Sequence, residues 1–371
     1  ITALRSGYKW DTRTKYQVWE DYKREGINAF PSVNFSAFVR EKTFLAKKFN
    51  LDFERKIFPL SGVSYAKTIL CNESGKWMSY VSDRYGFNNS DRVYENTRDS
   101  IIVAGDSFAH GDCVEPGDDV AGNLRRRGYT AITLGAGGNG PLAELATLRE
   151  YAPYLTPKII LWMYFEGNDF LDLPAEYDYP PLKKYLDSMD YTQNLAQKQG
   201  TIDKFYIDFF NFIREDFSRQ SGWRNFWNRE IIGLSWRLIS LHNVRKRLGL
   251  LQSSVYVRAG GETFNENEII FNAVMKAALA EAEKLNSKLY FVYLPAFESF
   301  FNDKYPLAPS SQKVRKVISE LNIPLIDFFD CLKNTGDPTS YFPFREGGHY
   351  NPLGYDLLAD IIEKEALECS A

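Results

Sequence analysis

A serine and a histidine that are far apart in the chain have residue types and surroundings suited to nucleophilic chemistry. Ser107 follows the apolar run Ile101–Ala104 and Gly105, in the stretch Gly-Asp-Ser-Phe. Four apolar residues suffice for a buried strand but not for a helix, so Ser107 is expected where a strand ends and a helix begins. There its hydroxyl would face the ligand crevice of an α/β sheet, and its N–H could stabilise an oxyanion. The alternative is that Asp106 and Ser107 only cap the helix.

A hydrolytic role for Ser107 requires a base within hydrogen-bond reach, and the chain has three histidines. His242 falls in the middle of an expected helix, where a surface or packing role is the simplest interpretation. His110 is three residues beyond Ser107 on the same short helix and is poorly placed to face the hydroxyl. His349 lies in a glycine-flanked loop after the last expected strand. We therefore predict that His349 is the base.

Two further polar stretches follow expected strands. The glycine-rich stretch Leu134–Pro141 could bring backbone N–H groups close to a ligand, and its spacing does not match a dinucleotide-binding loop. Glu166–Asp169 follows the next strand and places the Asn168 amide at the same sheet edge as Ser107. Asp106 and Asp169 are expected to bond loop amides around the site.

Taken in order, Gly-Asp-Ser-Phe, the glycine loop, Gly-Asn-Asp and a C-terminal acid-x-x-His resemble the four sequence blocks of the SGNH (GDSL) hydrolase family. The resemblance covers about residues 100–170 and 288–367. It implies a three-layer α/β/α flavodoxin-like sandwich and a serine mechanism of ester hydrolysis or acyl transfer. The residues of these blocks are similar to those of a bacterial subgroup associated with acylation of cell-surface polysaccharides.

The same resemblance implies a role for each matching residue. Ser107 would be the nucleophile and His349 the base, while the Gly138 N–H and the Asn168 side-chain amide would complete the oxyanion hole with Ser107. The family has Asp three residues before its His, whereas this chain has Glu346 there. We expect Glu346 to orient His349, with a backbone carbonyl as the alternative.

Strands and helices alternate from residue 100 onward, which predicts a mostly parallel sheet covered by helices on both faces. The sheet would be five-stranded. The expected strands are Ile101–Ala104, Tyr129–Leu134, Lys158–Phe165, Lys288–Leu294 and Pro324–Phe329, and the expected helices are Gly117–Arg127, Leu142–Tyr154, Asn267–Leu285, Ser311–Leu321 and Pro352–Leu367.

Two segments lie outside this pattern. Residues 1–99 are expected to form an N-terminal extension that wraps the core, with a helix over Asp11–Gly26 and a β-hairpin made by Lys67–Cys71 and Lys76–Val81. Residues 100–371 would form the hydrolase domain, with a helical insert at about 173–262. Helices are expected there over Ile202–Arg214 and Arg229–Leu248, and the aromatic side chains of the first would either pack on the main domain or form a lid or substrate wall.

The composition narrows the classes to which this protein can belong. The formal net charge of the 371 residues is −3, so we expect no nucleic-acid partner. No apolar run approaches the length of a membrane span. The three histidines and the lack of Cys-x-x-Cys argue against a zinc site, and we expect no cofactor. The chain opens on Ile1 without Met or a signal peptide, so it is interpreted as a mature fragment from which an anchor could have been removed.

Four cysteines are present, and we predict a disulfide between Cys71 and Cys113. Cys113 lies just beyond the nucleophile helix, and Cys71 ends a strand of the extension, which the bridge would tie to the core. Two separate buried thiols are the alternative, since sequence cannot determine connectivity. Cys331 and Cys369 are weaker candidates for a second bridge. A disulfide would favour an oxidising compartment.

The leading hypothesis is an esterase or acyltransferase that acts on O-acyl groups, chiefly acetyl, of a carbohydrate. A lipase or phospholipase is the second hypothesis, and a glycan-binding module with a decayed catalytic set, suggested by Glu346, is the third. The resemblance favours a periplasmic or extracellular protein, with a membrane anchor left open.

Overall fold

The computed structural model describes residues 10–33, 57–220, 261–301 and 309–368. The chain divides into two compact units. The first comprises Ile1–Asp203 and Asn267–Ala371, and the second Lys204–Glu266. The candidate site and both sheets lie in the first unit.

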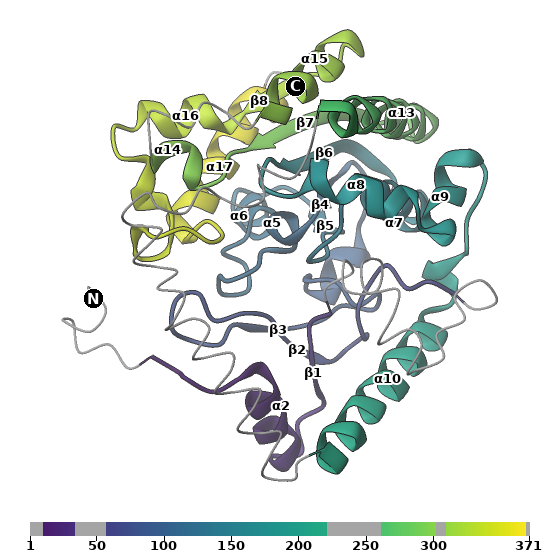
Figure 1. Cartoon of the computed structure of the whole chain (residues 1–371), viewed down its shortest axis with the longest axis vertical. Helices are drawn as coiled ribbons and strands as arrows, with labels where there is room; N and C mark the ends of the chain where they lie inside the picture. The colour runs from purple at the N-terminus through teal and green to yellow at the C-terminus, as the bar shows by residue number, and fades with distance from the viewer. Residues whose placement is uncertain (1–9, 34–56, 221–260, 302–308, 369–371) are drawn as a thin grey trace. The chain divides into compact units, whose positions relative to one another are not determined.

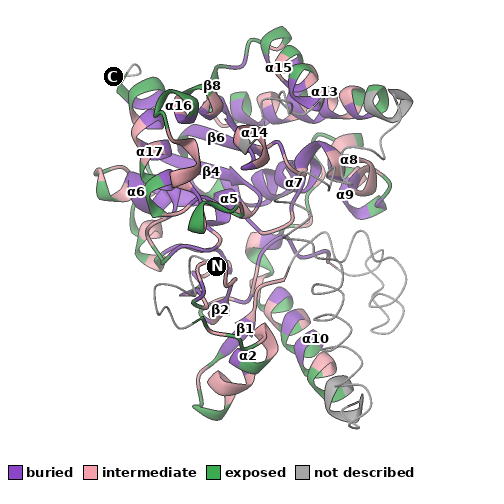
Figure 2. Cartoon of the chain, turned by 60° about the vertical axis from the view of Figure 1, so that its left-hand side comes forward, coloured by how far each residue is buried: buried purple, intermediate pink, exposed green. Residues whose placement is uncertain are grey.

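A five-stranded sheet forms the centre of this unit. Its strands are β4 (Ser100–Gly105), β5 (Ala131–Thr133), β6 (Pro157–Phe165), β7 (Lys288–Leu294) and β8 (Leu325–Asp327). All neighbouring pairs are parallel, in the order β5-β4-β6-β7-β8. This is the flavodoxin-like order of doubly wound folds. The predicted parallel sheet is confirmed, and β4, β6 and β7 carry the buried apolar residues expected of strands covered on both faces (Figure 2).

Helices cover both faces of this sheet (Figure 1). On one face a continuous hydrophobic core joins the sheet to α6 (Val120–Arg126), α16 (Phe328–Asn334) and α17 (Pro352–Ile362), with α5 (Ser107–His110) at the strand ends. On the other face lie α7 (Pro141–Tyr151) and α13 (Gly261–Lys284), whose Phe271 ring contacts Tyr164 of β6. The predicted three-layer α/β/α architecture is therefore confirmed.

Shorter helices and turns accompany these layers. Among the described residues they include α14 (Glu298–Phe301), α15 (Pro309–Glu320), 3-10 turns at Asp91–Glu95, Ala152–Tyr154, Leu195–Gln197, Pro338–Tyr341 and Pro343–Arg345, and a π-helical turn at Glu363–Leu367 that extends α17. None of the described helices is long and apolar enough to cross a bilayer.

The N-terminal extension builds a small sheet of its own. It contains α2 (Lys15–Arg24), β1 (Ala29–Pro31), β2 (Lys67–Ile69) and β3 (Ser79–Val81), in the order β1-β2-β3. Strands β2 and β3 pair antiparallel, so the predicted hairpin is confirmed, while β1 pairs parallel to β2. The buried Trp19 indole donates to the carbonyl of Ala29 at 2.7 Å and holds α2 on this sheet.

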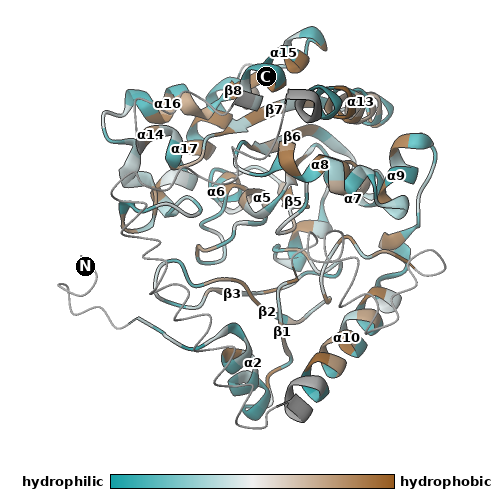
Figure 3. Ribbon diagram, viewed as in Figure 1, coloured by the Kyte–Doolittle hydropathy of each residue, from teal (hydrophilic) through white to brown (hydrophobic). Residues whose placement is uncertain are grey.

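Two helices that the sequence analysis did not predict follow β6. Helices α8 (Asp169–Tyr177) and α9 (Pro180–Asp187) pack on α7, within the first unit. Helix α10 (Gln199–Gln220) contains the first helix expected in the insert and carries both hydrophobic and hydrophilic residues along its length (Figure 3). Within the second unit the rings of Phe205 and Phe209 stack at 6.3 Å. The second expected helix, over Arg229–Leu248 and with it His242, lies outside the described residues.

Candidate active site

Ser107 is the first residue of α5, directly after strand β4. The strand ends at Gly105, where φ is +154° and an added Cβ would lie 2.8 Å from the carbonyl oxygen of Met163. The carboxylate of Asp106 caps the helix by accepting from the N–H of Phe108 at 2.9 Å. The chain therefore turns sharply between strand and helix, and this places the Ser107 hydroxyl at the carboxyl edge of the sheet.

His349 reaches this hydroxyl from the other end of the chain. Its Nε2 lies 2.8 Å from Ser107 Oγ, and its ring packs against Phe108 with the centroids 4.8 Å apart. The residue lies in the loop that precedes α17. The structure thus brings together the serine and the histidine that the sequence analysis selected, in the geometry required for proton transfer from the hydroxyl.

Glu73 holds the other side of the imidazole. Its Oε1 lies 3.0 Å from His349 Nδ1, and its Oε2 accepts from the backbone N–H of His349 at 2.8 Å. These two contacts hold the loop that carries His349 and fix the orientation of its imidazole ring. Glu73 lies in the turn between β2 and β3, in the N-terminal extension.

The structure corrects the expectation for Glu346. That residue is exposed at the end of a 3-10 turn, and the acid at Nδ1 is Glu73 instead. The two glycines that separate Glu346 from His349 have φ values of +98° and +102°, and they turn the chain between the two residues. At Gly348 a Cβ would lie 2.4 Å from Glu73 Oε2, so the missing side chain is what lets the distant carboxylate approach.

The charges around His349 alter its proton affinity. Burial alone would lower the pKa of His349, but the hydrogen bond and charge of Glu73, with the charges of Asp112 and Asp106, outweigh it and raise the pKa to about 9. Burial would raise the pKa of Glu73, but its bond to His349 lowers it. The site therefore stabilises an imidazolium next to a carboxylate, which is the state formed when the serine loses its proton.

A disulfide joins this acid-bearing turn to the nucleophile side of the site. Cys71 and Cys113 are bonded, with their Cα atoms 5.4 Å apart, which confirms the predicted pairing. Cys331 is a free cysteine, and Cys369 lies outside the described residues. Since Glu73 is two residues beyond Cys71, the bridge limits how far its carboxylate can move from His349.

Glu73, Cys113 and His349 also bring three potential metal-binding atoms within 4.8 Å of one another. The sulfur of Cys113 is in the disulfide, so it cannot act as a thiolate ligand. The remaining carboxylate and imidazole are already bonded to each other. This donor set does not fit a metal ion.

Reduction of the disulfide is expected to lower the rate of the predicted ester hydrolysis roughly tenfold to a hundredfold, because small displacements of a positioning group have effects of this size. The measurement is kcat/KM for an ester before and after treatment with a reductant. In a Glu73→Gln background the same treatment should change the rate little, since the group that the bridge positions is already lost. An equal loss in both backgrounds would show that the disulfide acts only on general stability.

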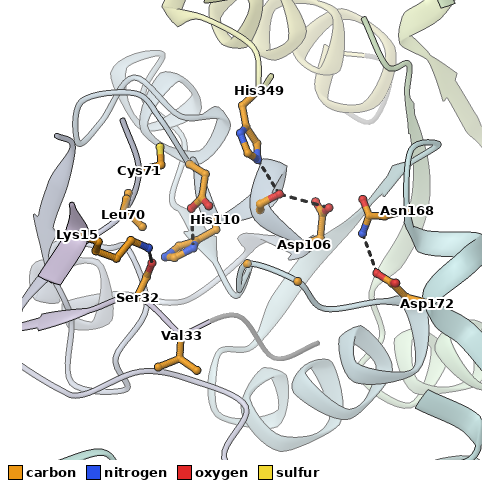
Figure 4. A pocket seen from close by; sticks show the side chains of 14 residues that line it. Lys15, Ser32, Val33, Leu70, Cys71, Asp106, His110, Asn168, Asp172 and His349 are labelled. Carbon is orange, nitrogen blue, oxygen red and sulfur yellow. Dashed lines mark hydrogen bonds and ion pairs between the residues drawn. The ribbon is translucent and has the colours of Figure 1, made fainter. Parts of the chain in front are cut away.

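Asn168 and Gly138 line the same pocket as Ser107 and His349, so all the predicted oxyanion-hole residues meet there (Figure 4). The Asn168 amide donates one N–H to Asp172 Oδ2 at 2.9 Å, which orients the amide and leaves its second N–H for a ligand. The glycine loop is held in turn by Glu176, whose carboxylate accepts from the N–H of Gly140 at 2.7 Å. Helix α8 therefore supports both parts of the candidate oxyanion hole.

Substitution of Asn168 by alanine is expected to lower kcat roughly 10²–10³-fold with little change in KM, because an oxyanion donor acts mainly on the transition state. Steady-state kinetics on a chromogenic ester measures both constants, and a thermal melt controls for folding. A raised KM with unchanged kcat would assign Asn168 to ground-state binding instead.

His110 is occupied elsewhere, as its position relative to Ser107 suggested. Its Nε2 lies 2.9 Å from the hydroxyl of Tyr80, and its Nδ1 lies 2.9 Å from the carboxylate of Asp112. Both ring nitrogens thus face partners other than Ser107. The residue forms part of the pocket wall.

The two carboxylates expected to support loops do so. Asp106 caps α5, and Asp169 accepts from the N–H of Phe165 at 2.7 Å. Burial raises the pKa of Asp106 to about 6 and the pKa of Asp169 well above its usual value.

The pocket over these residues has a volume of about 330 Å³. Residues from both the parallel sheet and the N-terminal extension line it. They are Lys15, Ser32, Val33, Leu70, Cys71, Asp106, Ser107, His110, Asp112, Gly137, Gly138, Asn168, Asp172 and His349. Polar side chains dominate this set.

No protein-family model matches the chain. No curated protein sequence matches it either. Among solved structures, the chain is similar to an acetyl xylan esterase, AlAXEase, at 14% identity and a TM-score of 0.38, over 72% of this chain and 100% of the other.

Two further solved structures have comparable similarity. One is a putative acylhydrolase from Bacteroides fragilis NCTC 9343, at 13% identity and a TM-score of 0.34, over 75% of this chain and 95% of the other. The other is a putative GDSL-like lipase from Parabacteroides merdae ATCC 43184, at 13% identity and a TM-score of 0.35, over 73% and 96%. With identities and TM-scores this low, we infer the fold from the strand order of the chain itself.

Proposed function

We propose that this chain is a serine ester hydrolase of the SGNH type, which works through an acyl-enzyme. The observation that carries the proposal is the continuous contact from Ser107 Oγ through His349 to Glu73, beside Asn168 and Gly138 in one pocket. A nucleophile, a base, an orienting acid and amide donors are the complete set of groups that acyl transfer needs.

In the first half of the reaction, Ser107 Oγ attacks the ester carbonyl carbon while His349 Nε2 takes the hydroxyl proton. The carbonyl oxygen becomes an oxyanion, which the N–H groups of Ser107, Gly138 and Asn168 stabilise. The tetrahedral intermediate then collapses. The ester C–O bond breaks, and the Nε2 proton passes to the departing alcohol.

In the second half, a water molecule attacks the acyl-enzyme, and His349 takes one of its protons. Collapse of this second intermediate returns the proton to Ser107 Oγ and releases the carboxylic acid. If an alcohol attacks in place of water, the same residues transfer the acyl group to it. Throughout both halves Glu73 keeps Nδ1 protonated and stabilises the imidazolium.

The dimensions and lining of the pocket favour a short acyl group, acetyl above all. A volume of about 330 Å³ must hold the acyl group and part of the alcohol, and among the described residues its apolar lining is limited to Val33, Leu70 and the disulfide at Cys71. A lipase would need a larger apolar surface for a long chain. The acid supplied by Glu73 removes the reason for considering a decayed glycan-binding module, which rested on Glu346 alone.

We extend the proposal to an O-acylated carbohydrate as the substrate and to an exported protein. The polar pocket suits a hydroxyl-rich alcohol, and the Cys71–Cys113 disulfide supports an oxidising compartment. Fractionation of the native cells tests the export, with the protein expected in the periplasm, the medium or the membrane fraction and not in the cytoplasm.

Hydrolysis of 4-nitrophenyl esters of increasing chain length tests the proposal. We expect turnover of the acetate, a steep fall in kcat/KM by the octanoate, and covalent labelling of Ser107 by an organophosphonate. Chromatography of products formed with and without a sugar acceptor distinguishes hydrolysis from transfer. A highest rate on the octanoate would favour the lipase, and absence of both turnover and labelling would contradict an esterase.

A further inference from the structure

The N-terminal extension contributes one cation to the catalytic pocket. Lys15 lines the pocket together with Ser32, and in Figure 4 the two lie on the side of His349 and Asp106 that is away from Asn168. Lys15 Nζ donates to Ser32 Oγ at 2.9 Å. Since an ammonium has three N–H donors, two remain for other acceptors.

The position of Lys15 in its helix opposes helix stability. It is the first residue of α2, directly after the Thr14 cap, and no acidic residue lies in this first turn. A cation at a helix N-terminus is unfavourable because the helix dipole is positive there. Stabilisation of the helix therefore does not explain a lysine at this place.

Within the described residues no carboxylate forms an ion pair with the Lys15 ammonium. Asp112, whose charge acts on Lys15, lies against His110 Nδ1 at 2.9 Å. Burial lowers the pKa of Lys15, and the charge of Asp112 opposes this. The side chain is half-buried, so its charge has lost part of its hydration without an ion pair to a carboxylate of the described residues.

We propose that Lys15, with Ser32, is a subsite for a carboxylate or similar anionic group of the ester substrate. This inference rests on the proposed esterase function and specifies its substrate class: an ester whose acyl or alcohol part is negatively charged. The anion would accept from the free N–H groups of Lys15 and from the Ser32 hydroxyl. The amide donors near Asn168 meanwhile hold the ester carbonyl on the other side of the pocket.

Two pairs of small esters, identical except for charge, test the subsite. Methyl hydrogen glutarate and methyl glutaramate place the charge in the acyl part, and O-acetyl-lactate and O-acetyl-lactamide place it in the alcohol part. A charge-assisted hydrogen bond corresponds to a roughly tenfold to hundredfold preference for the anion. We expect this preference in at least one pair, and the pair that displays it shows which part carries the charge.

The preference is measured in two ways that do not depend on each other. One is kcat/KM of the wild-type enzyme, and the other is Kd on the Ser107→Ala variant, which keeps the ester intact. Lys15→Met should reduce the anion-to-neutral ratio to about one, and Lys15→Arg should retain most of it. Lys23→Met, which removes the same charge from the last turn of the same helix and outside the pocket lining, should leave the ratio unchanged.

Equal binding of both members of each pair, or an equal loss for both in Lys15→Met, would overturn the subsite. These outcomes separate it from the esterase proposal. If the wild type hydrolyses the neutral esters without a charge preference, the esterase stands and the subsite fails. If no ester is hydrolysed but Ser107→Ala still prefers the anion through Lys15, the subsite stands and the esterase fails.

Discussion

Replacement of Ser107 by alanine is expected to lower kcat for ester hydrolysis by a factor on the order of 10⁵–10⁶, as loss of the nucleophile does in known serine hydrolases. The hydroxyl is the only group of the described site placed both at the helix start and 2.8 Å from a histidine nitrogen. Without it no acyl-enzyme can form, and only the oxyanion donors and substrate binding remain. Pre-steady-state kinetics without a burst of released alcohol would indicate that no acyl-enzyme forms. Loss of labelling by an organophosphonate would indicate the same.

In the proposed mechanism Ser107 and His349 act as one unit, so the effects of their substitutions should not add. His349→Ala is expected to cost nearly as much as Ser107→Ala, and the double variant little more than either alone. Both side chains are partly accessible in the pocket, so melting temperatures should stay close to that of the wild type. Wild-type turnover in Ser107→Ala, with folding intact, would reject the proposed mechanism.

The second large effect is expected at Glu73. Glu73→Gln keeps the size of the side chain but removes the charge that accepts the Nδ1 proton, and an equivalent change in a known triad lowers kcat by about 10⁴. Glu346→Gln is the matched control, because it makes the same chemical change at the exposed acid that lies three residues before His349 in the sequence. We expect the control to retain at least about half of the wild-type activity.

The pH profile distinguishes an orienting acid from a residue that only supports the fold. In the wild type, kcat/KM should rise with pH as His349 loses its proton, with the midpoint at about 9. In Glu73→Gln the contribution that raises the pKa of His349 is gone while burial still lowers it, so the midpoint should move to lower pH. A lower rate with an unchanged midpoint would mean that Glu73 does not act through the imidazole. A large loss of activity in Glu346→Gln would instead assign the orienting role to Glu346, the acid three residues before His349.

The parts of the site that local sequence determines were predictable from it. The strand end at Gly105, the helix start at Ser107 and the loop with Asn168 each depend on residues within a few positions, because burial periodicity and capping act over short distances. Parallel strands also place their carboxyl ends at one edge, so alternation of strands and helices was enough to bring Ser107 and Asn168 to the same side. The five strands lie within a few residues of their expected bounds.

The acid was decided by tertiary structure alone. Glu73 and His349 are 276 positions apart, and their contact exists because the small sheet of the extension docks at the edge where the parallel strands end. No local pattern encodes such docking. The one signal available was the expected Cys71–Cys113 bridge, which placed the turn that carries Glu73 near the nucleophile helix.

The position of Lys15 in the pocket could not be predicted from local sequence either. Its sequence neighbours predicted a helix and nothing about a pocket, since a lysine in an amphipathic helix normally faces solvent. Only the packing of α2 on the extension's sheet turns its ammonium toward Ser32 and the catalytic pocket. Sequence therefore determined the fold class and the candidate nucleophile and base, because these depend on local periodicity and strand ends. The association of two distant segments, which buries surface that neither buries alone, decided which acid contacts the candidate base and which cation lines the pocket.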